Sequence, residues 1–208
     1  MNGKPRFIVF EGLDGSGKST QVSLLSERLT QMNAPHTVTR EPTSANPVGR
    51  LAREAINGAF PLENETLALL FAADRYQHVA EEVLPALNRG EHVLCDRYYF
   101  SNFAYQGGSA DFDALYAYNR QVMKKRRPDL VLFIDVPPEE CVRRIMRRDG
   151  KPRSGIYENL ETLRGVRRRY LETFEKLRQS ENIVVLEAGG LTERETAELV
   201  YDRVRQYI

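Results

Sequence analysis

The sequence predicts an α/β protein, built as a five-stranded parallel sheet with helices on both faces. Short apolar runs alternate with helical patterns along the 208 residues, and this alternation is typical of a parallel sheet. The apolar runs are β-branched and lack polar alternation, which indicates strands buried on both faces. The length suits one domain better than two, so we expect a single domain over residues 1–208.

The individual elements follow from the same patterns. We expect strands at residues 7–10, 37–39, 93–95, 130–134 and 183–186. We expect helices at residues 21–29, 47–58, 62–88, 111–125, 138–149 and 158–180, and a last helix that runs to the C-terminus. Thr192, with Glu195 three residues later, forms a capping box that starts this last helix. Pro137 and Pro138 mark a helix start after the fourth strand.

The composition excludes several classes of partner. A net charge of +1 gives no global attraction to nucleic acid or to an acidic membrane. No apolar stretch approaches the roughly 20 residues of a membrane span, and the N-terminus carries no signal-like apolar region. Cys95 and Cys141 fit buried thiols in a reducing compartment, and the three histidines show no metal-ligand spacing. We therefore expect a cytoplasmic enzyme without a nucleic-acid or membrane partner.

The first strand leads into residues 11–20, which fit the phosphate-binding pattern G-x-x-x-x-G-K-[ST] between a strand and a helix. The glycines of this segment let the backbone approach a phosphate, and the positive end of the next helix faces the anion. Lys18 would reach the β and γ phosphates, and Ser19 would ligate Mg²⁺. A dinucleotide fingerprint would need a small residue where Thr20 stands. The residues expected to bind ATP here are Gly12, Leu13, Asp14, Gly15, Ser16, Gly17, Lys18, Ser19 and Thr20.

A second charged segment follows the third strand. Asp96 stands where a strand-end carboxylate can hold Mg²⁺ or its water, and Arg97 can bind two phosphate oxygens at once. The plainer alternative is an Asp–Arg ion pair at the surface, which would contribute little to the stability of the fold. Because ligands of such sheets bind at the carboxyl ends of the strands, we expect this pair to face residues 11–20.

Residues 96–107 resemble the D-R-Y-x-x-S-x-x-A-Y-Q-G segment of the thymidylate kinase family. Residues 39–42, 70–75 and 155–158 resemble three further segments of that family, and the resemblance covers essentially the whole chain in order. It implies the three-layer P-loop kinase fold with an arginine-rich lid. It also implies transfer of the γ-phosphoryl group of ATP to dTMP, with Mg²⁺, giving dTDP.

The resemblance implies roles for single residues at the acceptor site. Phe71 would stack on the thymine ring, and Arg75 would hydrogen-bond its carbonyl edge. Their i, i+4 spacing agrees, since it puts both on one helix face; a plain core position remains the alternative for Phe71. Arg97 would bind the acceptor phosphate. The residues expected to bind dTMP are Asp14, Glu41, Phe71, Arg75, Arg97, Ser101, Tyr105, Gln106 and Tyr157.

Some of these residues have alternatives. Tyr105 resembles the residue that disfavours a ribose 2′-hydroxyl, but Tyr105 and Tyr157 could be ordinary half-buried aromatic residues. Asp14 resembles a family carboxylate near the acceptor's 3′-hydroxyl, or it could shape the loop through backbone hydrogen bonds. The loop at residues 43–47 departs from the Gly-Gly-Thr that many bacterial members carry, which leaves the contacts of Arg40 and Glu41 open.

The predicted lid spans residues 147–156. Cations crowd this region, at Arg143, Arg144, Arg147, Arg148, Lys151 and Arg153. A solvated basic face is the default interpretation, but phosphoryl transfer calls for a cation supplied at closure. Gly15 stands where some family members carry an arginine, so the chain resembles the group with a lid arginine. We expect Arg153 to act, with Arg148 and Arg147 as the next candidates and Arg148 also near ATP. The catalytic set is then Lys18, Arg97, Arg153 and Asp14.

Two other functions remain open at this point. A related kinase could act on another nucleotide or on a nucleoside, with Glu11 or Asp14 recruited as a base. A nucleotide switch or sensor is less favoured, because no Asn-Lys-x-Asp segment for guanine is present. The resemblance further implies a homodimer.

Overall fold

The structure, a computed structural model, describes residues 4–149 and 159–208. Its sheet runs in the order β2-β3-β1-β4-β5, and every neighbouring pair is parallel. The strands are β1 (Phe7–Gly12), β2 (His36–Arg40), β3 (His92–Asp96), β4 (Leu130–Asp135) and β5 (Ile183–Glu187). The predicted fold class, a five-stranded parallel sheet with helices around it, is confirmed.

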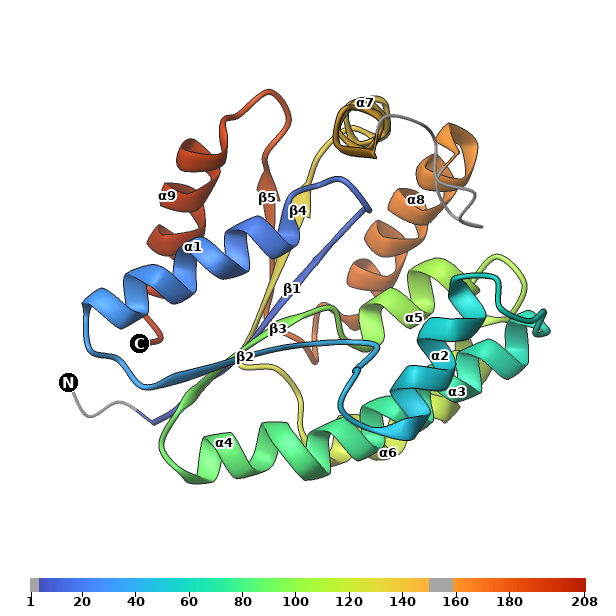
Figure 1. Cartoon of the computed structure of the whole chain (residues 1–208), viewed down its shortest axis with the longest axis horizontal. Coiled ribbons are helices and arrows are strands. Elements are labelled where there is room, and N and C mark those ends of the chain that lie inside the picture. Colours follow the sequence, from blue (N-terminus) through green and yellow to red (C-terminus); the bar gives the residue numbers. More distant parts are fainter. Residues whose placement is uncertain (1–3, 150–158) are drawn as a thin grey trace.

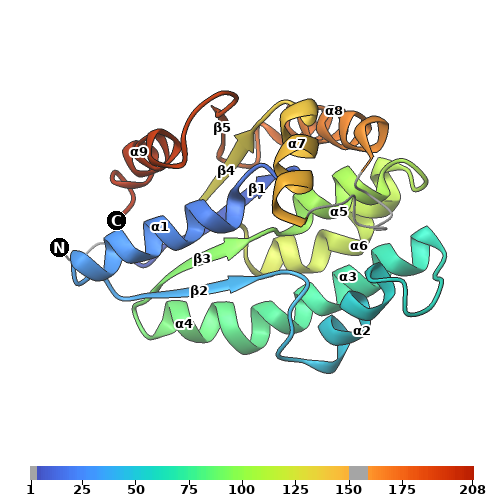
Figure 2. The same ribbon diagram turned by 45° about the horizontal axis from the view of Figure 1, so that its top comes forward.

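Helices enclose the sheet from both sides (Figure 1). Helices α1 and α9 pack together on one face, whereas α3 to α6 and α8 lie on the other. Figure 2 shows α7 above the carboxyl ends of β1 and β4. The helices are α1 (Lys18–Gln31), α2 (Pro47–Ile56), α3 (Asn64–His78), α4 (Leu84–Asn88), α5 (Tyr99–Gln106), α6 (Phe112–Lys125), α7 (Pro138–Asp149), α8 (Leu160–Leu177) and α9 (Glu193–Val204), with a π-helix η1 (Val79–Val83) between α3 and α4.

The register of the sheet brings the ends of three strands to one edge. Phe10 of β1 pairs with Asp96 at the end of β3, and Gly12 pairs with Ile134 near the end of β4. The loops that follow β1, β3 and β4 therefore leave the sheet side by side, as expected for ligand binding at the carboxyl edge.

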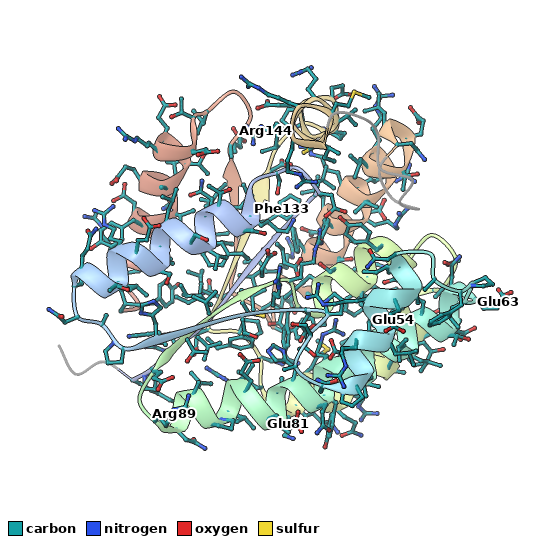
Figure 3. The ribbon with its side chains drawn as sticks, viewed as in Figure 1. Glu54, Glu63, Glu81, Arg89, Phe133 and Arg144 are labelled. Atoms are coloured by element: carbon teal, nitrogen blue, oxygen red, sulfur yellow. The ribbon has the colours of Figure 1, made fainter. Side chains whose placement is uncertain are left out.

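Burial follows the position of each strand in the sheet. All residues of β1 and β4 are buried, which agrees with the predicted strands covered on both faces. The edge strands are less covered, because each has a neighbour on one side only: Val38 of β2 is 47% exposed and Val185 of β5 is 43% exposed. Figure 3 shows Phe133 in the interior, whereas Glu63, Glu81 and Arg89 lie at the periphery.

Three details differ from the sequence-based expectations. Residues 99–106 form a helix, α5, that was not predicted. The predicted helix at 62–88 contains the π-turn η1, so its hydrogen-bond pattern changes after His78. The last helix ends at Val204 and not at the C-terminus, although its capping box between Thr192 and Glu195 is present.

The described part of the chain also bears on the expectations for the two cysteines and for membrane-spanning helices. Cys95 and Cys141 are buried free thiols, as expected. Burial raises the pKa of the Cys141 thiol to about 12, so it stays protonated at neutral pH. Among residues 4–149 and 159–208, no helix is long and apolar enough to cross a membrane.

Candidate active site

The loop between β1 and α1 has the backbone geometry of an anion site. Gly17 is the N-cap of α1, has a φ of 94° and leaves the helix start without a side-chain cap. The first N–H groups of α1 can therefore face an anion, together with the positive end of the helix. Gly15 has a φ of +82°, and a Cβ there would lie 2.6 Å from the carbonyl oxygen of Cys141. A side chain at position 15 would therefore collide with α7.

This loop opens into a cavity of about 630 Å³ between α1, α7 and the start of α9. Lys18 is 6% exposed, and its Nζ donates to the carbonyl oxygen of Leu13 at 2.9 Å. An ammonium has three hydrogens, so Lys18 keeps donors for phosphate oxygens. The lining residues are Asp14, Gly15, Ser16, Gly17, Lys18, Ser19, Thr20, Gln21, Arg144, Ile145, Arg147, Arg148, Leu191, Thr192, Glu193 and Thr196.

Ser19 and Asp96 form a pair that fits a magnesium ion. The Ser19 hydroxyl donates to Asp96 Oδ2 at 2.5 Å. Asp96 Oδ1 is buried and has no hydrogen-bond partner among the described residues. Hydroxyl and carboxylate oxygens are ligands that Mg²⁺ accepts, with water and substrate phosphate completing its shell. Among the described residues, no group of three or more His, Cys, Asp or Glu side chains is placed to hold a metal ion.

Arg97 connects the end of β3 to the phosphate-binding loop. It adopts a φ of 74°, and its backbone N–H donates to the Phe10 carbonyl at 2.9 Å. Its Nη2 donates to Asp14 Oδ1 at 2.6 Å and to the Tyr105 hydroxyl at 3.0 Å. Its Nη1 donates to Ser101 Oγ at 2.9 Å and to the Tyr170 hydroxyl at 3.2 Å. The guanidinium is thus held in one place from several elements.

Asp14 carries the negative charge in the cluster of side chains around Arg97, which also contains Tyr105, Ser101 and Tyr170. Removal from water raises the pKa of its carboxyl, but the positive charges of Arg97 and Lys18 outweigh that effect and the pKa ends below its usual value. The Tyr105 hydroxyl donates to Asp14 Oδ2 at 3.0 Å, and burial raises the pKa of that hydroxyl. Asp14 is therefore charged and Tyr105 protonated at neutral pH.

Glu11 lies beneath the cluster and supports it. Its carboxylate accepts hydrogen bonds from Ser101 Oγ at 2.7 Å and from the Tyr170 hydroxyl at 2.9 Å. It also accepts from the backbone N–H of Tyr98 at 2.8 Å. Burial raises the pKa of Glu11, against the charge of Arg97 and these hydrogen bonds. Glu11 lines neither the cavity at the phosphate-binding loop nor the second cavity, which is described next. Its contacts are therefore those of a positioning residue.

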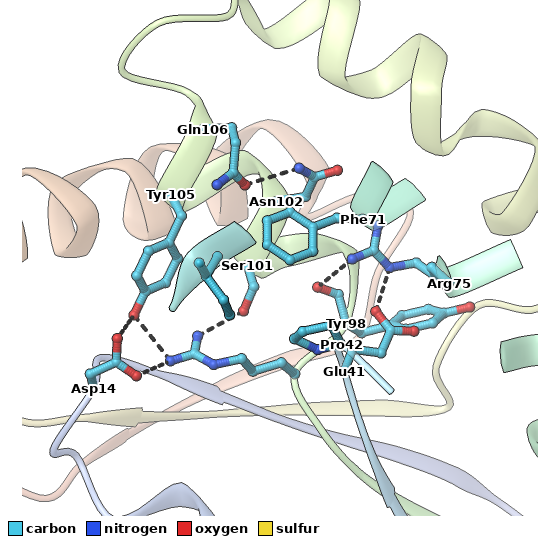
Figure 4. A pocket seen from close by; sticks show the side chains of 12 residues that line it. Asp14, Glu41, Pro42, Phe71, Arg75, Tyr98, Ser101, Asn102, Tyr105 and Gln106 are labelled. Carbon is cyan, nitrogen blue, oxygen red and sulfur yellow. Dashed lines mark hydrogen bonds and ion pairs between the residues drawn. The ribbon is translucent and has the colours of Figure 1, made fainter. Parts of the chain in front are cut away.

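A second cavity, of about 140 Å³, lies between α3, α5 and the end of β2 (Figure 4). Phe71 and Arg75 both border it from α3, as their spacing predicts, so Phe71 is not a plain core residue. The cavity joins an aromatic ring to a guanidinium and to several amides and hydroxyls. Its lining residues are Asp14, Glu41, Pro42, Ile56, Phe71, Arg75, Arg97, Tyr98, Ser101, Asn102, Tyr105 and Gln106.

Arg75 is buried and held by Glu41. Its Nε donates to Glu41 Oε2 at 2.7 Å. The other carboxylate oxygen, Oε1, accepts from His78 Nδ1 at 3.0 Å. Burial alone would lower the pKa of His78, but its hydrogen bonds to Glu41 and Glu82 outweigh this and raise it to about 9. Glu41 was expected to contact dTMP, and it does border the cavity, but its two oxygens already bind neighbouring side chains.

The loop at residues 43–47 is tied down by Asp74. Asp74 accepts hydrogen bonds from the Thr43 backbone N–H at 2.8 Å and from its hydroxyl at 2.7 Å. Asn46 caps α2 by accepting from the N–H of Gly49 at 2.9 Å. A side-chain network thus holds this loop, which departs from the Gly-Gly-Thr of many bacterial members, and connects it to Asp74, the neighbour of Arg75 in sequence.

The predicted lid is only partly in view. Arg153 and Tyr157 lie outside the described residues, as does the segment at 155–158. Arg147 and Arg148, the next candidates for the lid arginine, line the cavity of the phosphate-binding loop. Arg144, which was not among the favoured lid residues, contacts the loop directly, since its Nη1 donates to the Ser16 carbonyl at 3.3 Å. Figure 3 shows Arg144 beside α7, on the side of the phosphate-binding loop.

Several residues at the site were not singled out from the sequence. Tyr170 comes from α8, far along the chain, and nothing around it in the sequence marks it. Asn102 lies one turn before Gln106 on α5, and recognising α5 as a helix would have placed it on the same face. His78 follows Arg75 at i+3, a spacing that also shares a helix face.

The comparisons with known proteins agree on one family. A family model described as thymidylate kinase matches residues 10–198. A thymidylate kinase from Pelotomaculum thermopropionicum is 45% identical over 175 residues, which cover 81% of this chain and 79% of that protein. A thymidylate kinase from Carboxydothermus hydrogenoformans is 41% identical over 164 residues, which cover 77% of this chain and 76% of that protein.

A solved structure of thymidylate kinase from Candida albicans resembles the fold with a TM-score of 0.79 and 25% sequence identity. The similarity covers 99% of this chain and 93% of that one. The match of the family model over nearly the whole chain and the identity to several relatives lead to the same conclusion. The chain belongs to the thymidylate kinase family.

Proposed function

We propose that the chain transfers the γ-phosphoryl group of ATP to dTMP, giving dTDP and ADP, with Mg²⁺ as the metal. The observation that carries this proposal is that Asp14 borders both cavities. The phosphate-binding loop and the base-sized cavity thus meet at Asp14 and at its partner Arg97. Two nucleotides that occupy the two cavities would bring their phosphates together there.

The two sites would divide the work of phosphoryl transfer. The N–H groups at the start of α1 and the ammonium of Lys18 would hold the β and γ phosphates of ATP. Arg97 would hold the dTMP phosphate, exchanging part of its hydrogen bonding to Asp14 for phosphate oxygens. An oxygen of that phosphate would attack the γ-phosphorus while the bond to the β–γ bridging oxygen breaks, and ADP would leave.

No general base is required, because the attacking phosphate is already an anion. The acidity of Asp14 supports this, since its lowered pKa makes it a weak base. When bound, Mg²⁺ supplies positive charge to the β and γ phosphates. Ser19 and Asp96 would hold that ion, and the cations of α7 and the lid, with Arg153 first, would surround the transferred group.

The neighbouring functions are less well supported. A nucleoside kinase would need a base that faces its acceptor, whereas Glu11 accepts hydrogen bonds from Ser101, Tyr98 and Tyr170. A sensor would have no need for a second cavity that shares Asp14 with the first. Phe71 and Arg75 suit a pyrimidine, because a ring can stack on the base while a guanidinium donates to a carbonyl oxygen.

Product analysis tests this proposal. The protein is mixed with ATP, Mg²⁺ and dTMP, and the nucleotides are separated by anion-exchange chromatography. The expected result is dTDP and ADP in equal amounts, with neither formed by Lys18→Ala. ADP without dTDP would reduce the activity to hydrolysis and contradict the proposal.

The remaining expectations concern the whole chain. We infer a homodimer from the family resemblance, and the exposed side chains of Leu51, Leu69 and Tyr76 on α2 and α3 offer apolar surface for it. Light scattering on the purified protein would give the mass in solution. We also propose that residues 1–208 act as one kinase domain in the cytoplasm.

A further inference from the structure

A chain of buried amides connects Arg75 to Gln106 across three helices. Arg75 lies on α3, Asn119 on α6, and Asn102 and Gln106 lie one turn apart on α5. None of the four residues is more than 2% exposed. Arg75, Asn102 and Gln106 border the acceptor cavity, whereas Asn119 is not among its lining residues.

Two neighbours with only one possible hydrogen-bonding role determine which end of the Asn119 amide is the oxygen and which is the nitrogen. A guanidinium can only donate, so the contact of 2.5 Å from Arg75 Nη1 requires the amide oxygen of Asn119. The carbonyl oxygen of Leu115 can only accept, so its contact of 2.8 Å requires the amide nitrogen. Both contacts give the same orientation, which leaves one N–H of Asn119 for its remaining neighbour.

That orientation is passed on to Gln106. The remaining N–H of Asn119 donates to Asn102 Oδ1 at 3.0 Å. Because the Asn102 oxygen is taken, its nitrogen faces Gln106 and donates to Gln106 Oε1 at 3.0 Å. Figure 4 shows this last bond and the Gln106 nitrogen pointing away from Asn102.

We propose that Asn119 is a positioning residue for base specificity, which acts through Asn102 to hold the Gln106 amide with its oxygen inward and its NH₂ group as the end that can reach a base. The inference rests on the proposed function, since it concerns the same acceptor cavity. It adds a residue that does not touch the acceptor but decides how a residue of the cavity presents itself.

We call the chain of hydrogen bonds from Arg75 to Gln106 the relay. Its amide groups are held in one orientation because all its members are buried. Turning Gln106 alone would set two amide nitrogens against each other and leave Asn102 without an acceptor, and a buried unsatisfied group costs about 1–3 kcal/mol. Turning the whole relay would break the contacts of Asn119 with Arg75 and Leu115 as well. Gln106 is therefore fixed as a donor, although an amide in water presents either end.

The fixed donor selects one class of pyrimidine. Arg75 and the Gln106 NH₂ group both offer hydrogens, which suit the carbonyl oxygens of thymine or uracil. At ring position 4 cytosine carries an amino group where thymine has a carbonyl, so a donor of the site that faces this position would meet hydrogens instead of an oxygen. A site built to donate rejects such a ligand because donors remain unpaired on both sides.

Asn119→Asp tests the relay by reversing it. A carboxylate still accepts from Arg75, but it can donate neither to Asn102 nor to the carbonyl oxygen of Leu115. Asn102 then turns to donate to the new carboxylate, its oxygen faces Gln106, and Gln106 turns its oxygen toward the base. We expect the ratio of kcat/KM for dTMP over dCMP to fall by about tenfold or more, through KM more than through kcat. Thermal unfolding establishes that the variant is folded.

A double-mutant cycle with Gln106→Leu separates this route from an effect on Arg75. Without the Gln106 amide, Asn119→Asp should no longer change the ratio. If Asn119→Asp does not fold, Asn119→Leu replaces it, since it removes the relay without adding a charge; its ratio should also fall, and the fall should vanish in the Gln106→Leu background.

The outcomes distinguish this inference from the proposed function. No turnover of dTMP by the wild-type protein would overturn the proposed function itself. Normal wild-type turnover with an unchanged ratio in the folded Asn119 variants would overturn the relay alone. A fall in the ratio that persists in the Gln106→Leu background would also overturn it, because Asn119 would then act through Arg75.

Discussion

Arg97 Nη2 lies 2.6 Å from Asp14 Oδ1, and this ion pair joins the end of β3 to the phosphate-binding loop. The two residues are far apart in sequence and meet because β1 and β3 are neighbours in the sheet. The pair stands where the two cavities meet, so the cation that would hold the acceptor phosphate is already positioned by the loop that would hold the donor.

Arg97→Lys should lower kcat/KM for dTMP by about a hundredfold, because an ammonium keeps the charge but cannot bind two phosphate oxygens in a plane. Steady-state kinetics would measure the change, with the affinity for ATP expected to stay within a few-fold. A lysine variant with wild-type kcat/KM would show that charge alone suffices and would remove the bidentate role.

Tyr105→Phe should lower kcat/KM for dTMP by about tenfold, since the Tyr105 hydroxyl both accepts from Arg97 and donates to Asp14. The matched control is Tyr118→Phe, which removes a hydroxyl that bonds Glu65 at the surface of α6. The control should behave as wild type. Equal kinetics for the two variants would mean that the Tyr105 hydroxyl does not order the cluster.

Asp96→Asn should raise the Mg²⁺ concentration needed for half-maximal rate by about tenfold, because an amide is a weaker ligand for a hard cation than a carboxylate. Rates measured across a magnesium titration would give this value. Chelation of the metal should stop turnover while leaving the thermal unfolding of the protein without nucleotide unchanged. An unaltered magnesium dependence in the variant would place the ion elsewhere.

Arg153→Ala should lower kcat by about tenfold or more with little change in ATP affinity, because a lid cation is needed most when charge develops on the transferred group. Turnover at saturating substrates and ATP binding by calorimetry would separate the two effects. Near-normal kcat would point instead to Arg148 or Arg147, which border the phosphate cavity.

His78 should make stability depend on pH. Its folded pKa of about 9 lies above the ordinary value of 6.5, so protonation favours the folded state. This contribution is complete below about pH 6.5 and is lost as the pH rises through about 9; a shift of this size corresponds to roughly 3 kcal/mol.

Urea unfolding at a series of pH values would measure this effect, with His78→Gln as the matched variant. The gap in unfolding free energy between the two proteins should narrow as the pH rises from neutral to about 10. A constant gap over that range would contradict a charged His78 beside Glu41.

The fold could be predicted from local patterns because its strands are short apolar runs between helices. The phosphate-binding loop is also local, since strand, glycines, lysine and helix follow one another within residues 7–31. Helix α5 was missed because its aromatic residues have modest helix propensity. Tyr99, Phe100 and Phe103 are buried, and their packing outweighs that preference.

The supporting contacts of the site could not be predicted, because they join distant parts of the chain. Glu41 was expected at the acceptor, but its engagement by Arg75 and His78 depends on how α3 packs against the end of β2. Asn119 meets Arg75 only through the contact of α6 with α3. No spacing in the sequence reports such a meeting.

The most direct test of the account is ADP release with ATP, Mg²⁺ and a panel of acceptors: dTMP, dUMP, UMP, CMP, AMP, GMP and thymidine. We predict rapid release with dTMP and little with the ribonucleotides, since Phe71, Arg75 and Tyr105 border a cavity suited to thymine and a deoxyribose. Release only with a different acceptor would contradict the base site while keeping the kinase. No acceptor-dependent release, with ATP still bound, would contradict the account and favour a nucleotide sensor.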